Sequence, residues 1–154
     1  MNKYFVIGNP IGHSLSPLIH NYWIKKYRII DSHYEKRKID EENLESFVNE
    51  VRWDDEIRGV NVTVPYKKKI IPFLDDLGNG AKNTQSVNTL LKENNKIVGF
   101  NTDCWGFYYS LKPFEGSHEG FFEKCFIIGA GGVTPSILEM LSSSKVYITN
   151  RTKQ

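Results

Sequence analysis

Short apolar runs alternate with helical patterns along the N-terminal part of the chain, and this alternation constrains the fold more than any other feature. Strand-like runs at 4–7, 32–37 and 60–64 enclose helical patterns at 18–27 and 44–51. This order is typical of βαβ units, in which a helix brings the chain back so that the next strand lies parallel to the last. It predicts an α/β fold with a mostly parallel sheet.

The start of the first helix is marked by Ser16 and Pro17. A serine can cap the free N–H groups of a helix, and proline is tolerated in the first turn. The apolar face of this helix is expected to consist of Leu18, Ile19, Tyr22 and Trp23. The preceding residues 9–15 are then a loop between a strand and a helix.

Beyond residue 64 the pattern predicts a hairpin, a helix and a loop. Extended runs at 87–91 and 97–100 flank the Asn-rich stretch 92–96, which is typical of a hairpin turn. Asp103 is expected to start a helix. The Gly, Ser and His residues at 116–120 predict a loop, so we expect a domain boundary between Asn101 and Gly120.

A glycine-rich turn follows the apolar strand 125–128 and precedes the helical pattern 136–141. It consists of Gly129, Ala130, Gly131 and Gly132. Strand, glycine turn and helix are the context of a dinucleotide fingerprint, in which the backbone approaches the pyrophosphate at a helix N-terminus. The third fingerprint position, normally Gly or Ala, is Thr134, so a plain tight turn is the alternative.

The residues after the next expected strand, 146–149, bear on cofactor choice. They are Asn150, Arg151 and Thr152, where NAD-selective enzymes usually carry an acidic residue. An arginine here can pair with the 2′-phosphate of NADP. The alternative is that Arg151 is a solvated surface charge.

Polar residues also gather where the strands of the first domain are expected to end. Strand alternation places Asn61 and Thr63 opposite the valines of 60–64, and Pro65 is expected to end that strand just before Lys67. Ligands of open α/β sheets bind at the carboxyl ends of strands, which is where Lys67 and loop 9–16 fall. Such a pocket suits hydroxyls and a carboxylate. The alternative is that Ser16 only caps its helix, Thr63 faces solvent and Lys67 is one of three solvated lysines.

A second polar cluster lies in residues 86–89 and 99–103. It ends at Asp103, which at a helix start can accept backbone N–H bonds. Capping and catalysis are compatible roles, and both remain open at this point.

Composition narrows the class of protein. The chain has 154 residues, 40% of them apolar, and a net charge of +2 with scattered basic residues, so we expect neither a nucleic-acid partner nor a membrane partner. Cys104 and Cys125 are the only cysteines, and their spacing predicts neither a zinc site nor a disulfide framework. The apolar stretch at the N-terminus is too short for a signal peptide, and a cytoplasmic location is expected.

Six motifs, in order along the whole chain, resemble the shikimate dehydrogenase family. They are Gly8-Asn9-Pro10-Ile11-Gly12-His13-Ser14-Leu15-Ser16-Pro17, Gly59-Val60-Asn61-Val62-Thr63-Val64-Pro65-Tyr66-Lys67, Ser86-Val87-Asn88-Thr89, Gly99-Phe100-Asn101-Thr102-Asp103, Gly129-Ala130-Gly131-Gly132 and Asn150-Arg151-Thr152. The resemblance implies reversible reduction of 3-dehydroshikimate to shikimate by NADPH, on the route to chorismate and the aromatic amino acids. It also implies a substrate-binding domain over 1–101, a connecting helix and loop over 102–119, and an incomplete Rossmann NADP-binding domain over 120–154.

The resemblance also assigns residue roles. Ser14 and Ser16 would bind the substrate carboxylate, and the ring hydroxyls and reacting carbonyl would meet Thr63, Lys67, Asn88 and Asp103. Lys67 would be the proton donor and acceptor with Asp103 as its partner. The cofactor pyrophosphate would lie on Gly129, Ala130, Gly131 and Gly132, and the 2′-phosphate on Asn150, Arg151 and Thr152.

The chain departs from the family pattern at Gln154, because family members continue well past this point. We therefore expect a C-terminally truncated chain that by itself turns over little substrate. Two alternatives stay open: a shikimate- or quinate-binding module without catalysis, and a quinate/shikimate dehydrogenase that uses NAD. The oligomeric state, monomer or homodimer, is also left open.

Overall fold

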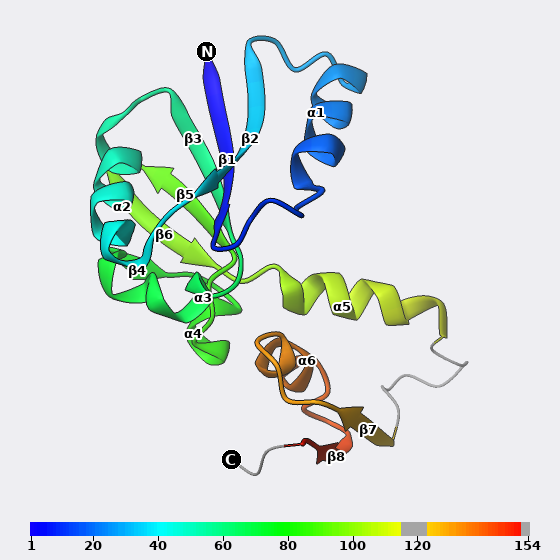
Figure 1. Ribbon diagram of the computed structural model, residues 1–154. Coiled ribbons are helices and arrows are strands. Elements are labelled where there is room, and N and C mark those ends of the chain that lie inside the picture. The colour runs from blue at the N-terminus through cyan, green and yellow to red at the C-terminus, as the bar shows by residue number, and fades with distance from the viewer. Residues whose placement is uncertain (115–122, 152–154) are drawn as a thin grey trace.

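The computed structural model describes residues 1–114 and 123–151, which form two sheets (Figure 1). The six-stranded sheet has the order β2-β1-β3-β5-β6-β4 and comprises β1 (Asn2–Gly8), β2 (Ser32–Lys38), β3 (Ile57–Val62), β4 (Asp76–Leu77), β5 (Thr89–Glu93) and β6 (Lys96–Phe100). The two-stranded sheet comprises β7 (Lys124–Ile128) and β8 (Lys145–Thr149).

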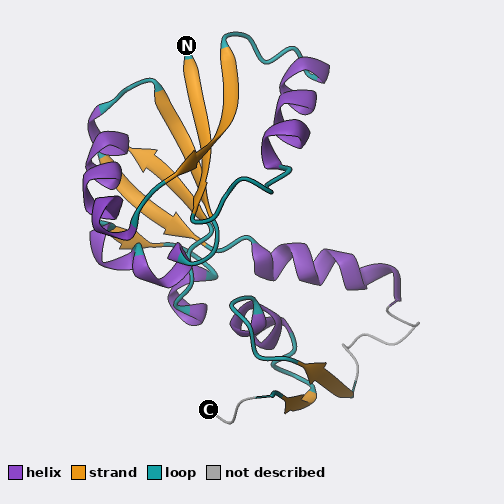
Figure 2. Ribbon diagram, in the orientation of Figure 1, coloured by secondary structure: helices purple, strands orange, loops and turns teal. Residues whose placement is uncertain are grey.

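The helices between these strands follow the predicted alternation (Figure 2). The α-helices are α1 (Ser16–Lys26), α2 (Leu44–Trp53), α3 (Tyr66–Lys69), α4 (Ala81–Thr84), α5 (Asp103–Leu111) and α6 (Thr134–Met140). The short 3-10 helices are η1 (Glu41–Asn43), η2 (Ile71–Phe73) and η3 (Lys112–Phe114).

Strand directions in the six-stranded sheet follow the βαβ pattern at one edge and change toward the other. β1 pairs in parallel with both β2 and β3, and β4 pairs in parallel with β6. β5 runs antiparallel to β3 and to β6. Parallel pairing predominates, and the predicted α/β class is confirmed.

The predicted hairpin is formed by β5 and β6. Asn94 and Asn95 connect the two strands with φ angles of 49° and 63°. Asparagine tolerates this left-handed conformation better than most residues, which is why an Asn-rich turn favours a hairpin of this type. The strand before the turn begins at Thr89, two residues later than predicted.

One face of the six-stranded sheet is covered by α2, which buries its apolar stripe in the main core. The stripe consists of Leu44, Phe47, Val48 and Val51, spaced as one side of a helix requires. The facing side chains on the strands include Ile7, Val60, Val62 and Leu90. Each such side chain stabilises the fold by about 1.5–3 kcal/mol when fully buried.

Helix α1 packs differently from the prediction. Its expected apolar face is exposed, at 72% for Leu18 and 60% for Tyr22. The reason is polar anchoring: the Asn21 amide accepts a bond from the Tyr34 backbone N–H (3.0 Å) and donates one to the Tyr34 carbonyl (2.7 Å). These bonds satisfy the free edge of β2 and turn Asn21, rather than Leu18 and Tyr22, toward the strand.

The predicted capping role of Ser16 is also wrong. Ser16 is the first helical residue and Leu15 occupies the cap position. The hydroxyl near this terminus is that of Ser14, which accepts a bond from the Ser16 N–H at 3.3 Å. Pro17 does lie in the first turn, as predicted.

β3 ends at Val62 rather than continuing to Val64. The Thr63 N–H still donates to the Ile7 carbonyl (3.0 Å), but Val64 is 65% exposed. The Val64 carbonyl accepts a bond from the Asn9 N–H (3.3 Å). The chain thus leaves the sheet before Pro65 and enters α3 directly beside the loop that follows β1.

β7, α6 and β8 form a βαβ unit (Figure 1). The helix α6 connects the two strands, which pair in parallel. The loop predicted at 116–120 lies outside the described residues. In the described part of the chain, every helix is too short or too polar to cross a membrane.

Candidate active site

Lys67 and Asp103 meet where α3 and α5 begin, beyond the ends of β3 and β6. The Lys67 Nζ donates to one carboxylate oxygen of Asp103 at 2.5 Å. Their side chains are 21% and 25% exposed, so the pair is shielded from bulk solvent but still reachable. A partly desolvated pair of this kind can exchange a proton with a ligand while holding a fixed geometry.

Asn88 holds the other oxygen of the Asp103 carboxylate. The Asn88 Nδ2 donates to that oxygen at 2.8 Å, while the Asn88 Oδ1 accepts the Thr102 backbone N–H at 3.0 Å. The backbone donor fixes which end of the amide faces which neighbour. The Asp103 carboxylate therefore serves Lys67 and Asn88, and the interpretation of Asp103 as a plain helix cap is wrong, because the cap position is that of Thr102.

Lys67 differs from the two lysines that follow it. Its backbone carbonyl accepts the Val87 N–H at 2.8 Å, which ties α3 to the segment that enters β5. The preceding Tyr66 is buried and its hydroxyl donates to the Ile39 carbonyl at 2.6 Å. Lys69, by contrast, forms an exposed pair with Glu41. The alternative of three equivalent solvated lysines is thus wrong for Lys67.

The serines expected to bind a carboxylate lie in the loop after β1 and at the start of α1. Ser14 and Ser16 are both half-buried. The loop that carries Ser14 begins at the carboxyl end of β1, which is the same end of the sheet at which the parallel strand β3 leads to Lys67.

Gly8 and Thr63 explain how closely the loops pack at this end of the sheet. A Cβ atom on Gly8 would lie 2.8 Å from the Thr63 Cγ2 and 2.9 Å from the Val64 carbonyl oxygen. Only glycine allows this approach. Thr63 is half-buried, and its methyl group packs against the backbone of Gly8. The alternative that Thr63 simply faces solvent therefore does not hold for this methyl group.

The glycine turn lies between β7 and α6, as predicted. Gly129 has φ +102°, a conformation that favours glycine, and its N–H donates to the Thr149 carbonyl at 2.7 Å. Within the described residues, a Cβ at Gly131 or Gly132 would meet no heavy atom within 4 Å. The turn therefore leaves room for a ligand beside its backbone. Thr134, the unusual third fingerprint residue, is buried at the start of α6.

Asn150 and Arg151 directly follow β8, and Arg151 is exposed. This places the arginine at the end of the second strand of the βαβ unit, where a guanidinium can reach an anion. Thr152, the third residue of that motif, lies outside the described residues.

A buried asparagine, Asn101, joins the end of the six-stranded sheet to helix α6, and sequence reasoning missed it as a site residue. Its Nδ2 donates to the Ser136 hydroxyl (2.9 Å) on α6 and to the Thr84 hydroxyl (3.0 Å), and its Oδ1 accepts the Asp103 N–H (2.9 Å). It lay inside a quoted motif, but its partners are distant in the sequence and no local pattern indicates them.

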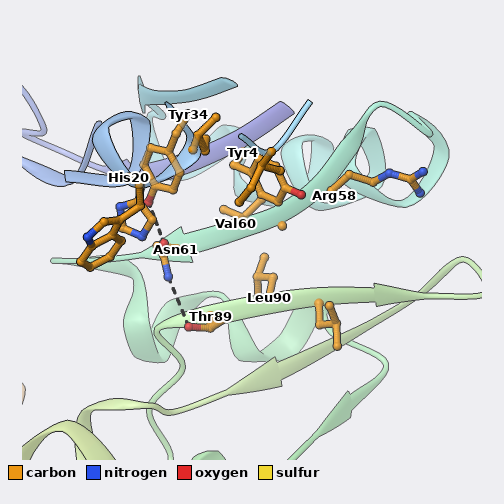
Figure 3. Close-up of a pocket in the computed structure, with 13 residues that line it drawn as sticks. Tyr4, His20, Tyr34, Arg58, Val60, Asn61, Thr89 and Leu90 are labelled. Carbon is orange, nitrogen blue, oxygen red and sulfur yellow. Dashed lines mark hydrogen bonds between the residues drawn. The ribbon is translucent and has the colours of Figure 1, made fainter. Parts of the chain in front are cut away.

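A cavity of about 420 Å³ lies under α1, on the sheet face opposite α2 (Figure 3). Its walls are mostly apolar and include Tyr4, Trp23 and Ile24. The polar residues that line it include Asn61 and Thr89, which are joined by a hydrogen bond of 3.3 Å. Neither Lys67 nor Asp103 lines this cavity.

Comparison with known proteins identifies the relatives of this chain. The family profile described as "Shikimate dehydrogenase substrate binding domain" matches residues 6–90. The shikimate dehydrogenase (NADP(+)) of Pelagibacter ubique is 50% identical over 157 aligned residues, which cover 99% of this chain and 58% of the relative.

Solved structures agree. The structure of shikimate dehydrogenase from Aquifex aeolicus is 36% identical to this chain with a TM-score of 0.88. The match covers 100% of this chain and 57% of the Aquifex aeolicus chain. The Thermus thermophilus enzyme in complex with NADP(H) and shikimate is 33% identical with a TM-score of 0.84, over 99% and 57% of the two chains. This chain thus spans somewhat more than half the length of the relatives it matches.

Proposed function

Since the chain belongs to the shikimate dehydrogenase family, we propose that it binds shikimate and takes part in the NADP-dependent, reversible reduction of 3-dehydroshikimate to shikimate. The observation that carries the proposal is the contact between Lys67 and Asp103, held by Asn88 at the ends of the strands. Open α/β sheets bind their ligands at this edge.

The substrate would lie between the loop after β1 and the Lys67–Asp103 pair. Ser14 and Ser16 would donate their hydroxyl hydrogens to the substrate carboxylate, and Thr63 and Asn88 would meet the ring hydroxyls. A shikimate molecule presents a carboxylate at one end and three hydroxyls at the other, which suits serines on one side and an ammonium–carboxylate pair on the other.

Lys67 is the group that would move the proton. The bound nicotinamide would supply the hydride, so negative charge develops on the ketone oxygen of the substrate. An ammonium beside that oxygen stabilises the charge and donates a proton from its Nζ. Asp103 would accept a bond from the neighbouring hydroxyl and keep the ammonium aimed. Lysine suits this role because it can release its proton, whereas arginine holds its own.

The glycine turn and the residues after β8 suit NADP. The open space beside Gly131 and Gly132 and the left-handed φ of Gly129 would let the pyrophosphate approach the backbone. Ala130 would lie in the same turn. Asn150, Arg151 and Thr152 would surround the 2′-phosphate, with Arg151 as the charged partner.

The domain limits follow from the same proposal. Residues 1–101, which contain the six-stranded sheet, would form the substrate-binding domain. Residues 102–119 would connect it to the start of a Rossmann domain over 120–154. The location we propose is the reducing cytoplasm, because the spacing of the two cysteines in the sequence predicts no disulfide framework.

The proposal is tested by titrating the 154-residue chain with shikimate and by assaying the complete product of the gene. Calorimetry should detect shikimate binding, and the Asp103→Asn variant should weaken it more than Asp76→Asn, a change at an exposed carboxylate. Shikimate and quinate should each be assayed with NADP⁺ and NAD⁺, and shikimate with NADP⁺ should be oxidised fastest.

Other results would point elsewhere. Shikimate binding without oxidation by either cofactor would indicate a binding module, and equal oxidation of quinate with NAD⁺ would indicate a broader dehydrogenase. The same assay on the 154-residue chain tests the expectation that it turns over little substrate.

A further inference from the structure

A continuous row of hydrogen bonds leads from Tyr34 on β2 to Asp103 on α5. The Tyr34 hydroxyl donates to the Asn61 Oδ1 at 2.6 Å, and the Asn61 Nδ2 donates to the Thr89 hydroxyl at 3.3 Å (Figure 3). The Thr89 hydroxyl donates to the Asn88 Oδ1 at 3.0 Å, and the Asn88 Nδ2 donates to Asp103 at 2.8 Å. We call these five residues the relay.

Every bond of the relay points the same way. An amide accepts at its oxygen and donates at its nitrogen, so Asn61 and Asn88 each accept one bond of the row and donate the next. The hydroxyl of Thr89 does the same. The order ends at the Asp103 carboxylate, which can only accept when it is charged. Bonds aligned in series polarise one another, so each is stronger than it would be alone.

The first donor of the relay is fixed by its surroundings. Tyr34 is buried, and its ring stacks on His20 with centroids 4.1 Å apart and planes 12° from parallel. The Asn21 side-chain amide hydrogen-bonds both the backbone N–H and the backbone carbonyl of Tyr34. Burial also raises the pKa of the phenol, so its hydroxyl keeps the hydrogen that it donates.

We infer that Tyr34 and Thr89 are positioning residues for the active site: through Asn61 they fix the amide of Asn88, and through Asn88 the carboxylate of Asp103. Neither side chain is among the residues expected to touch shikimate. The relay crosses the sheet from β2 to β5, so it transmits the placement of β2 and α1 to the Lys67–Asp103 pair. The consequence for binding rests on the proposed function, whereas the ordering of Asn88 does not.

The inference is tested on the ¹⁵N-labelled 154-residue chain with two independent deletions of a relay hydroxyl. Tyr34→Phe and Thr89→Val each remove one hydroxyl and keep the side-chain shape. The Asn88 side-chain N–H resonances should shift in both variants. Thr89→Ser, which restores a hydroxyl, should return them toward the wild-type position. Tyr4→Phe is the matched control, because Tyr4 lines the same cavity outside the relay (Figure 3).

Shikimate affinity supplies the second readout. Loss of one relay bond should weaken shikimate binding about three- to tenfold in Tyr34→Phe and Thr89→Val, with near-normal binding in Thr89→Ser and Tyr4→Phe. Unfolding temperatures of all four variants identify any that lose the fold.

The possible outcomes separate the relay from the proposed function. Asn88 resonances that stay in place in both folded deletion variants would overturn the relay. Resonances that move while affinity is unchanged would overturn the positioning role. A wild-type chain that does not bind shikimate would contradict the proposed function, and the Asn88 shifts would still decide whether the relay exists.

Discussion

The buried amide of Asn101 donates a 2.9 Å hydrogen bond to the hydroxyl of Ser136, and this bond joins the end of the six-stranded sheet to helix α6. The oxygen of the same amide accepts the Asp103 N–H. One side chain therefore fixes both the start of α5, where the proposed catalytic carboxylate lies, and the helix that follows the glycine turn. The contact between the two parts of the chain is thus specific.

Asn101→Ala should destabilise the chain by about 2–4 kcal/mol. It would leave the Ser136 hydroxyl and the Asp103 N–H without their buried partner, whereas the Thr84 hydroxyl keeps its bond to the Gly80 carbonyl. Each unsatisfied group costs about 1–3 kcal/mol unless water replaces it. Urea unfolding at neutral pH measures the loss.

Asn83→Ala is the matched control for that measurement. Asn83 also bonds to α6, donating to Glu139 at 2.6 Å, but this bond is exposed and its loss should cost well under about 1 kcal/mol. Equal destabilisation by the two variants would show that burial of the Asn101 amide has no special importance.

Lys67→Ala should lower turnover roughly 10²- to 10⁴-fold in the complete product of the gene, with a much smaller change in KM. The ammonium would act mainly on charge that develops during hydride transfer, so its loss affects the transition state more than the bound substrate. Steady-state kinetics with shikimate and NADP⁺ measure both constants.

Lys69→Ala provides the comparison, because Lys69 lies near Lys67 on the same short helix but in an exposed pair with Glu41. It should leave both constants near those of the wild type. A Lys67→Ala enzyme whose only defect is a raised KM would remove Lys67 from the chemistry.

Periodicity predicted the elements but not how they face each other. Spacing of apolar residues predicted a helix over 44–51, where α2 lies. The same reasoning gave Leu18 and Tyr22 as the apolar face of α1, yet both are exposed, because it could not foresee that Asn21 would bind the free edge of β2. A polar anchor between two distant elements leaves no periodic trace.

The relay was missed for a related reason. Tyr34, Asn61 and Thr89 lie on three strands, and their contact depends on the strand order β2-β1-β3-β5. The ring of Tyr34 packs with Val6 of the strand between β2 and β3 and reaches Asn61 beyond it. Local sequence patterns predict that strands exist, whereas the pairing order arises only when the whole sheet assembles. The proximity of Lys67 and Asp103 was predicted through family motifs, which carry that long-range information.

Arg151→Ala should reduce kcat/KM for NADP⁺ roughly 10- to 100-fold and change the value for NAD⁺ little. A hydrogen bond to a charged group contributes about 1.5–3 kcal/mol, and only NADP⁺ carries the 2′-phosphate that the guanidinium would pair with. Kinetics with both cofactors measure the ratio. Lys124→Ala is the control: Lys124 is an exposed charge at the start of β7, in the same two-stranded sheet, and its loss should leave the ratio unchanged. Equal losses with both cofactors in Arg151→Ala would argue against a 2′-phosphate contact.

Asp75→Asn should destabilise the chain at neutral pH and progressively less in acid. The Ile97 backbone N–H, which donates to Asp75 at 2.6 Å, and the Arg52 guanidinium at 2.9 Å lower the pKa of this carboxyl below its ordinary value of 3.8. The folded chain therefore favours the charged carboxylate more than the unfolded chain does. The resulting stabilisation is fully present above the unfolded pKa and is lost as the pH falls through the lower folded one.

Thermal unfolding at several values between pH 7 and pH 3 measures this dependence. The difference in Tm between the wild type and Asp75→Asn should stay constant down to about pH 5 and shrink below about pH 4. Asp76→Asn is the control: the neighbouring carboxylate is exposed and lies 3.6 Å from Lys82, so its replacement should change Tm little at any pH. A wild-type advantage over Asp75→Asn that is as large at pH 3 as at pH 7 would show that the charge on Asp75 does not stabilise the fold.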